Sequence, residues 1–210
     1  MKNIFILGDS YSTFKGWVPE GFSYYYGPGR TDGADVLDVA DTWWHKLVSE
    51  TGANIVENNS WSGSTISYMG RDGDCSRSSS YIYRFNTFVE NNPEACEKID
   101  TVFLFGATND SWIGVPLGCG DPTAKIERMD LYNVLPAIIH LIKRIRESLP
   151  AARLVCLINT GLKPEISECF VNACREYSAT AIELCDIDKI NGHPTKLGMT
   201  QIKNQILANI

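Results

Sequence analysis

The sequence lacks long hydrophobic runs and clusters of positive charge. None of its apolar runs approaches the roughly 18 residues that a membrane span needs, and the run at residues 4–7 is too short for a signal peptide. Lys and Arg number 19 against 25 Asp and Glu, so the net charge is −6 and no basic stripe is present to bind phosphates. We therefore expect a cytoplasmic protein that binds neither a membrane nor a nucleic acid.

Motifs for disulfides and metals are missing as well. The seven cysteines are an odd number without a Cys-x-x-Cys pair, which predicts free thiols rather than a disulfide framework or a zinc site. Asp32, Asp35, Asp38 and Asp41 recur at a spacing of three, which differs from the alternating ligand order of a calcium loop. We expect a solvated turn that leads into a helix cap there, and no metal site.

What the sequence does contain is the pattern of a single α/β domain spanning residues 1–210. Hydrophobic residues make up 44% and charged residues 21%, as in an ordinary globular protein. Short apolar or β-rich runs predict five strands, at residues 2–7, 54–57, 101–105, 153–158 and 181–187. Helical spacing predicts helices at residues 42–50, capped by Asp41, and at 131–149, 164–177 and 195–208. Alternating strands and helices imply a parallel sheet covered on both faces, with functional residues at the carboxyl ends of its strands.

A serine and a histidine stand at that edge of the predicted sheet. Ser10 lies in Gly-Asp-Ser directly after the first strand, and His193 lies between the last strand and the last helix. A serine nucleophile needs such a base. His45 and His140 fall within helical patterns, where packing or exposure explains them better. Taken alone, Gly-Asp-Ser is also a common turn, and a histidine in the place of His193 also serves as a helix cap.

Two further turns provide hydrogen-bond donors for an oxyanion. Asn109 follows the central strand in the segment FGATND, and Gly63 follows the second strand in the segment NNSWSG. The tetrahedral intermediate of acyl transfer needs donors such as an Asn amide and a backbone N–H, which a glycine lets approach closely. Each segment by itself is equally compatible with an ordinary turn.

These four elements, in this order, resemble the SGNH (GDSL-like) hydrolase family of esterases and lipases. Ser10, Gly63, Asn109 and His193 match the residues that name the family, and the resemblance spans nearly the whole chain. It implies a flavodoxin-like, three-layer α/β/α sandwich around a five-stranded parallel sheet. It also implies an oxyanion hole formed by the N–H groups of Ser10 and Gly63 and by the Asn109 amide.

The chain departs from the family pattern at three positions. Tyr11 stands where the family name implies Leu, and Ala107 replaces the Gly of Gly-x-Asn-Asp, but neither change removes a catalytic group. The triad acid of the family usually lies three residues before the histidine, where this chain has Ile190. Asp188 and Asp186 are the nearest carboxylates. Either Asp188 reaches the imidazole through a bulged loop, which we favour slightly, or a backbone carbonyl orients the ring of a Ser-His dyad.

The resemblance implies a serine hydrolase that cleaves carboxylic esters and needs no metal or organic cofactor. His193 takes the proton of Ser10, Ser10 attacks the carbonyl carbon, and water hydrolyses the acyl-enzyme. Small acyl esters are the expected substrates. Trp61 and Trp112 lie beside the two oxyanion elements and are candidate substrate-binding residues. Sugar rings stack on such faces, which suits acetylated carbohydrate, although a satellite core under long loops explains the aromatics equally well.

Other readings of the sequence stay open at this point. Residues 110–127, rich in Gly and Pro, are predicted to form a substrate-facing loop on the catalytic edge. The missing acid also suits a catalytically silent SGNH-like protein that only binds its ligand. A flavodoxin-like nucleotide binder is disfavoured, because no Gly-rich phosphate loop follows the first strand. The oligomeric state is not determined by the sequence.

Overall fold

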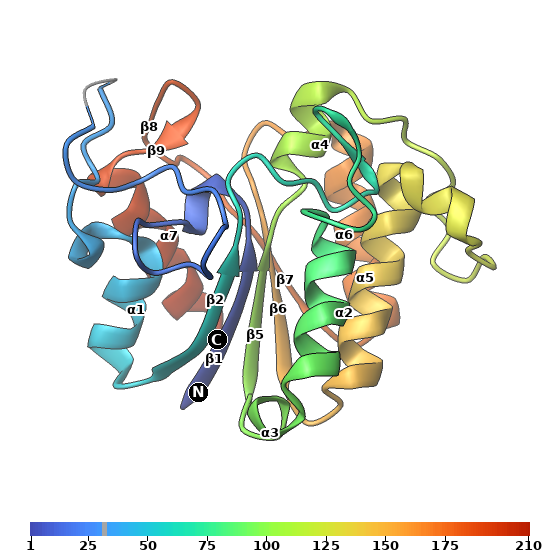
Figure 1. Cartoon of the computed structure of the whole chain (residues 1–210), viewed down its shortest axis with the longest axis horizontal. Coiled ribbons are helices and arrows are strands. Elements are labelled where there is room, and N and C mark those ends of the chain that lie inside the picture. Colours follow the sequence, from blue (N-terminus) through green and yellow to red (C-terminus); the bar gives the residue numbers. More distant parts are fainter. Residues whose placement is uncertain (31–32) are drawn as a thin grey trace.

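A five-stranded parallel sheet forms the centre of the computed structural model, which describes residues 1–30 and 33–210. Its strands are β1 (Asn3–Gly8), β2 (Asn54–Ser60), β5 (Thr101–Phe105), β6 (Arg153–Ile158) and β7 (Thr180–Glu183). They lie in the order β2-β1-β5-β6-β7, and every neighbouring pair is parallel. Helices cover both faces of the sheet (Figure 1), so the chain forms the predicted three-layer α/β/α sandwich.

Side chains that alternate along the strands divide the core in two. Ile4 and Ile6 of β1 face α1 (Trp43–Thr51) and α7 (Lys196–Asn209), which pack against one another on one side of the sheet. Phe5 and Leu7 face α2 (Tyr81–Asn91), α5 (Val134–Ser148) and α6 (Pro164–Glu176) on the other. This period of two is what a strand buried on both faces requires. No helix among the described residues is long and apolar enough to span a membrane.

The structure contains every predicted strand and helix, with ends that differ from the prediction by up to four residues, and it contains helices that were not predicted. β5 and β6 occupy the predicted residues 101–105 and 153–158. The last strand ends at Glu183 instead of residue 187, because the N–H of Cys185 donates a hydrogen bond to the side chain of Gln205 and not to a neighbouring strand. α2, with the short α3 (Pro93–Cys96) after it, and α4 (Thr108–Ile113) were not predicted. The aromatic residues of α2 have low helix propensity, so its packing on the sheet stabilises it.

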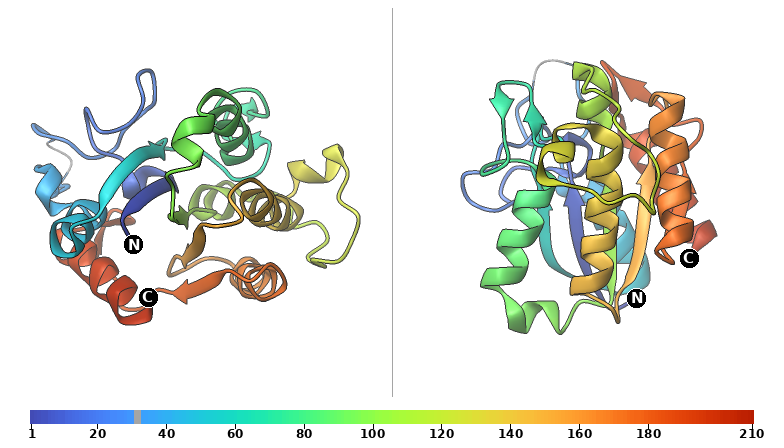
Figure 2. Two further views of the ribbon diagram at one scale, coloured as in Figure 1. Left: turned by 90° about the horizontal axis from the view of Figure 1, so that it is seen from below. Right: turned by 90° about the vertical axis from the view of Figure 1, so that its right-hand side faces the viewer.

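The carboxyl ends of the strands carry the irregular segments of the molecule. A 3-10 turn, η1 (Ser10–Ser12), follows β1 directly. Two small antiparallel hairpins lie at the same end: β3 (Met69–Gly70) with β4 (Gly73–Asp74), and β8 (Lys189–Ile190) with β9 (His193–Pro194). Figures 1 and 2 show these loops gathered above the sheet, with both chain termini toward the opposite end. The segments after the strands therefore gather at one edge of the sheet, where the sequence analysis places the candidate functional residues.

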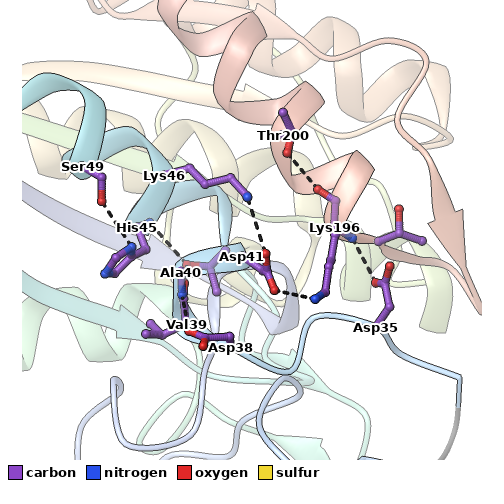
Figure 3. Close-up of polar contacts among 12 residues, drawn as sticks. Asp35, Asp38, Val39, Ala40, Asp41, His45, Lys46, Ser49, Lys196 and Thr200 are labelled. Atoms are coloured by element: carbon purple, nitrogen blue, oxygen red, sulfur yellow. Dashed lines mark hydrogen bonds and ion pairs between the residues drawn. The ribbon is translucent and has the colours of Figure 1, made fainter.

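The acidic run before α1 connects α1 and α7 instead of capping α1 (Figure 3). Asp41 pairs with Lys46 of α1 at 3.6 Å and with Lys196 of α7 at 2.8 Å. The cap of α1 is Thr42, so the predicted Asp41 cap is wrong; Asp38 caps the 3-10 turn η2 (Val39–Asp41). A threonine hydroxyl accepts a hydrogen bond from the N3 amide of a helix, as an aspartate carboxylate does, so Thr42 can cap α1. The carboxylate of Asp41 is then available to pair with the two lysines. Asp32, the first member of the acidic run, lies outside the described residues.

Candidate active site

Ser10 and His193 meet at the carboxyl edge of the sheet. Ser10 opens the turn η1 and is only 3% exposed, while His193 begins β9 and is half-buried. The Nε2 atom of His193 lies 3.0 Å from the Oγ atom of Ser10, although 183 residues separate them. At this distance an imidazole accepts a hydroxyl proton directly.

The second nitrogen of the imidazole faces a backbone carbonyl. Nδ1 of His193 lies 3.1 Å from the carbonyl oxygen of Asn191. A proton on Nδ1 that is donated to this oxygen leaves Nε2 unprotonated toward Ser10, which is the tautomer that a general base needs.

Asp188, the favoured triad acid, has a different partner. Its exposed carboxylate accepts a hydrogen bond from the hydroxyl of Thr195, the N-cap residue of α7. Its own carbonyl also accepts the N–H of Thr195 at 3.1 Å. The described contacts thus place Asp188 at the start of α7 and do not bring its carboxylate to the ring of His193.

Aromatic rings surround the imidazole. The ring of Tyr25 stacks on His193, with centroids 3.6 Å apart and planes 6° from parallel. The guanidinium of Arg30 lies 4.0 Å from the ring centroid of Tyr25, on the loop that follows η1. Trp112, 49% exposed, meets His193 edge-to-face at 5.7 Å. Trp112 thus lies near His193, as its position in the sequence predicted. The contact of Tyr25 was not predicted, because stacking between residues so far apart in the chain leaves no local pattern.

Buried tyrosines hold the hairpin that carries His193. The Tyr11 hydroxyl donates to the carbonyl of Gly192, and the Tyr26 hydroxyl donates to that of Pro194 at 2.7 Å. Lys189 of β8 donates its Nζ to side chains of the segment after β6. These bonds fix the backbone on both sides of the imidazole, and Tyr11, which departs from the family pattern, is one of the residues that make them.

Gly63 and Asn109 lie on segments that are hydrogen-bonded to one another. Gly63 has φ +83°, a left-handed conformation that favours glycine. Asn109, 4% exposed in the first turn of α4, donates from Nδ2 to the carbonyl of Ser64 at 2.9 Å. An amide nitrogen has two protons, so this bond orients the side chain and leaves the second proton for another acceptor. Ala107 also has a positive φ of 67°, where a glycine would avoid a strain of about 1 kcal/mol.

A buried carboxylate anchors the segment after Gly63. Asp110 accepts the N–H groups of Ile66 at 2.9 Å and Ser67 at 3.1 Å. Burial raises the pKa of Asp110, and these hydrogen bonds oppose the rise. The bonds tie α4 to the chain beyond β2, so Asn109 and Gly63 keep their relative positions.

A second buried carboxyl group belongs to Asp9, the residue before Ser10. Asp9 is 1% exposed; its Oδ1 accepts the N–H of Tyr11 at 3.0 Å, and its Oδ2 has no hydrogen-bond partner among the described residues. Burial raises the pKa of Asp9 from 3.8 to about 7, against the hydrogen bond from Tyr11. The folded protein therefore holds this proton at pH values where the unfolded chain has released it.

We expect this proton to make stability fall as pH rises. Because the folded pKa of Asp9 lies above its unfolded value, its contribution is present at about pH 4 and is lost by about pH 7. Between pH 5 and pH 8 the loss is roughly 3 kcal/mol of unfolding free energy. Asp9→Asn keeps an acceptor for Tyr11 and removes the titration. Urea unfolding at both pH values should show a flatter dependence in this variant; equal pH dependence in both proteins contradicts the assignment.

A cavity of about 450 Å³ borders the segment that holds Gly63. Trp61, Gly63 and Ser64 line one side, and the hairpin β3–β4 with Ser78 and Ser79 lines the other. The ring of Trp61 packs against that of Phe22, with centroids 4.3 Å apart and planes 34° from parallel. The backbone N–H of Trp61 donates to the carbonyl of Gly8 at 3.1 Å. The walls of the cavity combine serine hydroxyls and the charged side chains of Arg71 and Asp72 with the Trp61 ring and glycine backbone, and Ser10 itself does not line it.

The stretch 110–127 faces the site only at its beginning. Trp112 belongs to α4 and contacts His193, as described above. From Pro116 onward the chain packs on α5 and α6: the carbonyls of Pro116 and Leu117 accept the first N–H groups of α5, and the carbonyl of Pro122 accepts the Tyr177 hydroxyl at 2.8 Å. The predicted substrate-facing loop is wrong beyond α4, because the free donors of a helix N-terminus bind the chain there.

Arg84, a residue of α2, is the largest feature of the site that the sequence analysis missed. It is 2% exposed and donates to the carbonyl of Gly8. The helical spacing 81, 84, 85, 88 of α2 is the signal that would have found it, because this spacing puts an arginine on a buried helix face.

Known proteins match the chain over its whole length. The family model GDSL-like Lipase/Acylhydrolase matches residues 2–210. A crystal structure described as a GDSL-like lipase from Bacteroides uniformis is 37% identical, with a TM-score of 0.88, and the match covers 100% of this chain and 95% of that chain. One from Bacteroides ovatus is 39% identical, with a TM-score of 0.88 and coverages of 99% and 97%. No curated protein matches the chain.

A more distant structure shares the fold alone. An acetyl xylan esterase from Butyrivibrio proteoclasticus is 15% identical, with a TM-score of 0.62. The match covers 99% of this chain and 62% of that chain.

Proposed function

Because the chain belongs to the GDSL-like lipase/acylhydrolase family, we propose that it hydrolyses carboxylic esters through an acyl-enzyme on Ser10, with His193 as general base. The observation that carries this proposal is the 3.0 Å distance between Ser10 Oγ and His193 Nε2. The carbonyl of Asn191 orients the imidazole from its other nitrogen.

The reaction proceeds in two halves. His193 accepts the Ser10 proton while Oγ attacks the ester carbonyl, and the imidazolium then protonates the leaving alcohol as the carbon–oxygen bond breaks. In the second half, His193 takes a proton from water as the water oxygen attacks the acyl carbon. The imidazolium then returns this proton to Ser10 Oγ as the bond between Oγ and the acyl carbon breaks, and the carboxylic acid that leaves ionises in solution. Tyr25 supports both halves, since its ring face favours the positive charge that the stacked imidazole acquires.

The oxyanion is stabilised by three donors in this proposal. The N–H groups of Ser10 and Gly63 and the second Nδ2 proton of Asn109 point to the oxygen on which negative charge develops. The bond from Asn109 to Ser64 fixes the amide before substrate binds, so little reorganisation is required during the reaction.

We expect Asn109→Ala to lower kcat by roughly 10²–10³ with only a small change in KM. The donor matters most when charge develops on the oxygen, and the neutral carbonyl of the bound ester interacts with it weakly. Steady-state kinetics with an aryl acetate, beside a melting curve, test this. A lower melting temperature with normal turnover per folded molecule would show that Asn109 only braces the turn against Ser64.

We propose small acyl esters as substrates, with acetylated carbohydrate as the favoured group. The cavity beside Gly63 combines the half-buried ring of Trp61 with serine hydroxyls and with the charged side chains of Arg71 and Asp72. Hydroxylated rings suit such walls better than an alkyl chain does. Trp112 lies on the His193 side and is assigned to the other part of the ester. The partner is then a small molecule, and neither a membrane nor a nucleic acid is required.

Two assays test the proposed function. Hydrolysis of 4-nitrophenyl esters with acyl chains of two to twelve carbons, compared with acetylated xylose and cellobiose, should show a preference for acetyl groups and for the sugar esters. Treatment with a fluorophosphonate should place a single adduct on Ser10, located by mass spectrometry. Absence of both ester hydrolysis and adduct would favour a silent binding protein of the same fold.

A further inference from the structure

Arg84 is a fully buried cation with an unusual set of partners. Its Nε donates to the carbonyl of Ser79 at 2.9 Å. Its Nη1 donates to the backbone and side-chain oxygens of Asn59, the latter at 2.9 Å. Its Nη2 donates to the carbonyl of Gly8 at 3.2 Å and to the hydroxyl of Ser64 at 3.1 Å. Every terminal nitrogen is therefore used, and all the partners are neutral oxygens.

These partners belong to the segments that form the proposed site. Gly8 ends β1 and lies two residues before Ser10. Ser64 directly follows Gly63, and its carbonyl accepts the Asn109 amide at 2.9 Å. One guanidinium thus bonds both Gly8, at the turn of the nucleophile, and Ser64, in the segment of the oxyanion donors. Ser64 in turn connects it to Asn109, the third donor.

A buried arginine is costly to keep in a core. Burial lowers the pKa of Arg84 to about 10, so it remains charged at neutral pH. An apolar side chain of similar volume would fill the same space without the desolvation cost, which burial of a charge always carries. What an apolar side chain lacks is the planar fork that holds several oxygens in fixed positions.

We infer that Arg84 is a positioning residue, which fixes the separation between Ser10 and the donors at Gly63 and Asn109. The inference rests on the proposed function, because it assigns these three residues to one reaction. A displacement of about 1 Å between reacting groups costs on the order of 100-fold in rate. Loss of the Arg84 guanidinium should therefore lower kcat and change KM much less, because it disturbs the alignment of the reacting groups more than the binding of substrate.

The test compares Arg84→Met, Arg84→Lys and, as a matched control, Arg144→Met, which removes a partly buried arginine of α5 bonded to Asn86. Well below the melting temperature, Arg84→Met should lose about 100-fold in kcat with KM changed less than about threefold. Arg84→Lys keeps the charge without the fork and should recover only part of the loss. Arg144→Met should keep the wild-type kcat. Wild-type kcat per folded molecule in Arg84→Met overturns the inference, as does full recovery in Arg84→Lys.

A second, smaller change covers the case in which Arg84→Met does not fold. Ser64→Ala deletes one acceptor of the guanidinium, together with the hydrogen bond that the Ser64 hydroxyl donates to the carbonyl of Trp61 at 2.7 Å, and leaves the cation and its other bonds. It should lower kcat about tenfold, and an unchanged kcat contradicts the inference.

Hydrogen exchange measured by mass spectrometry separates this inference from the proposed function. Peptides that cover residues 8–13 and 59–66 should exchange faster in the Arg84 and Ser64 variants, while those of α6 should not. Unchanged exchange overturns the inference whatever the activity. Faster exchange in a protein that hydrolyses no ester would support the positioning and contradict the proposed function.

Discussion

Ser10→Ala is expected to lower kcat for ester hydrolysis by about six orders of magnitude, to the level of the uncatalysed background. The substitution removes one oxygen atom from a side chain that is 3% exposed and bonded to His193 at 3.0 Å. Without that oxygen no acyl-enzyme forms, and the oxyanion donors alone accelerate attack by water only weakly. The melting temperature should stay close to that of the wild type, because a single neutral hydrogen bond contributes about 1 kcal/mol.

The matched control for this change is Ser12→Ala. Ser12 lies in the same 3-10 turn and is equally buried, but its hydroxyl oxygen accepts a hydrogen bond from the indole N–H of Trp43 and does not contact His193. It should keep most of the activity and lose some stability. If Ser12→Ala were as inactive as Ser10→Ala, the turn rather than the Ser10 hydroxyl would be what matters. A fluorophosphonate adduct that persists in Ser10→Ala would move the nucleophile to another serine.

His193→Ala is expected to lower kcat by five to six orders of magnitude, since a serine without its base is a poor nucleophile. Asp188→Asn should change kcat less than about tenfold, because its carboxylate bonds Thr195 and asparagine keeps an oxygen there. An acid that orients the base would instead cost about 10⁴. His140→Ala, a half-buried histidine of α5, is the control for loss of an imidazole.

The two histidine variants and Asp188→Asn together distinguish the versions of the site. Full activity in His193→Ala would remove the proposed base altogether. A loss of about 10⁴ in Asp188→Asn with unchanged stability would show that the carboxylate moves onto the imidazole during the reaction. The expected pattern, an inactive His193→Ala beside an active Asp188→Asn, assigns the orientation of the ring to the carbonyl of Asn191 and its hairpin.

The five strands, four of the helices and the edge of the sheet that carries Ser10 and His193 could be predicted from local patterns, whereas α2, α3 and α4 were not. Apolar runs of strand length predicted both ends of β5 and of β6 correctly, because a strand that is buried on both faces has few polar positions. Ser10, Asn109 and His193 each follow a strand, and parallel strands bring their carboxyl ends to one edge. The same reasoning placed Trp112 beside the site. These features depend on sequence separations of a few residues, which the chain itself displays.

Only the tertiary structure decided which groups touch. Asp188 and the Asn191 carbonyl are both close to His193 in sequence. The path of the hairpin β8–β9 places the Asn191 carbonyl against the imidazole and the Asp188 carboxylate against the hydroxyl of Thr195. Tyr25 reaches His193, and Arg84 reaches Gly8, across 168 and 76 residues of separation. Bonds of this kind depend on how strands and loops cross in space, and no local period or turn motif encodes them. The sequence alone therefore determined the strands, the edge and the candidate residues of the site, while packing between distant segments determined how those residues are held.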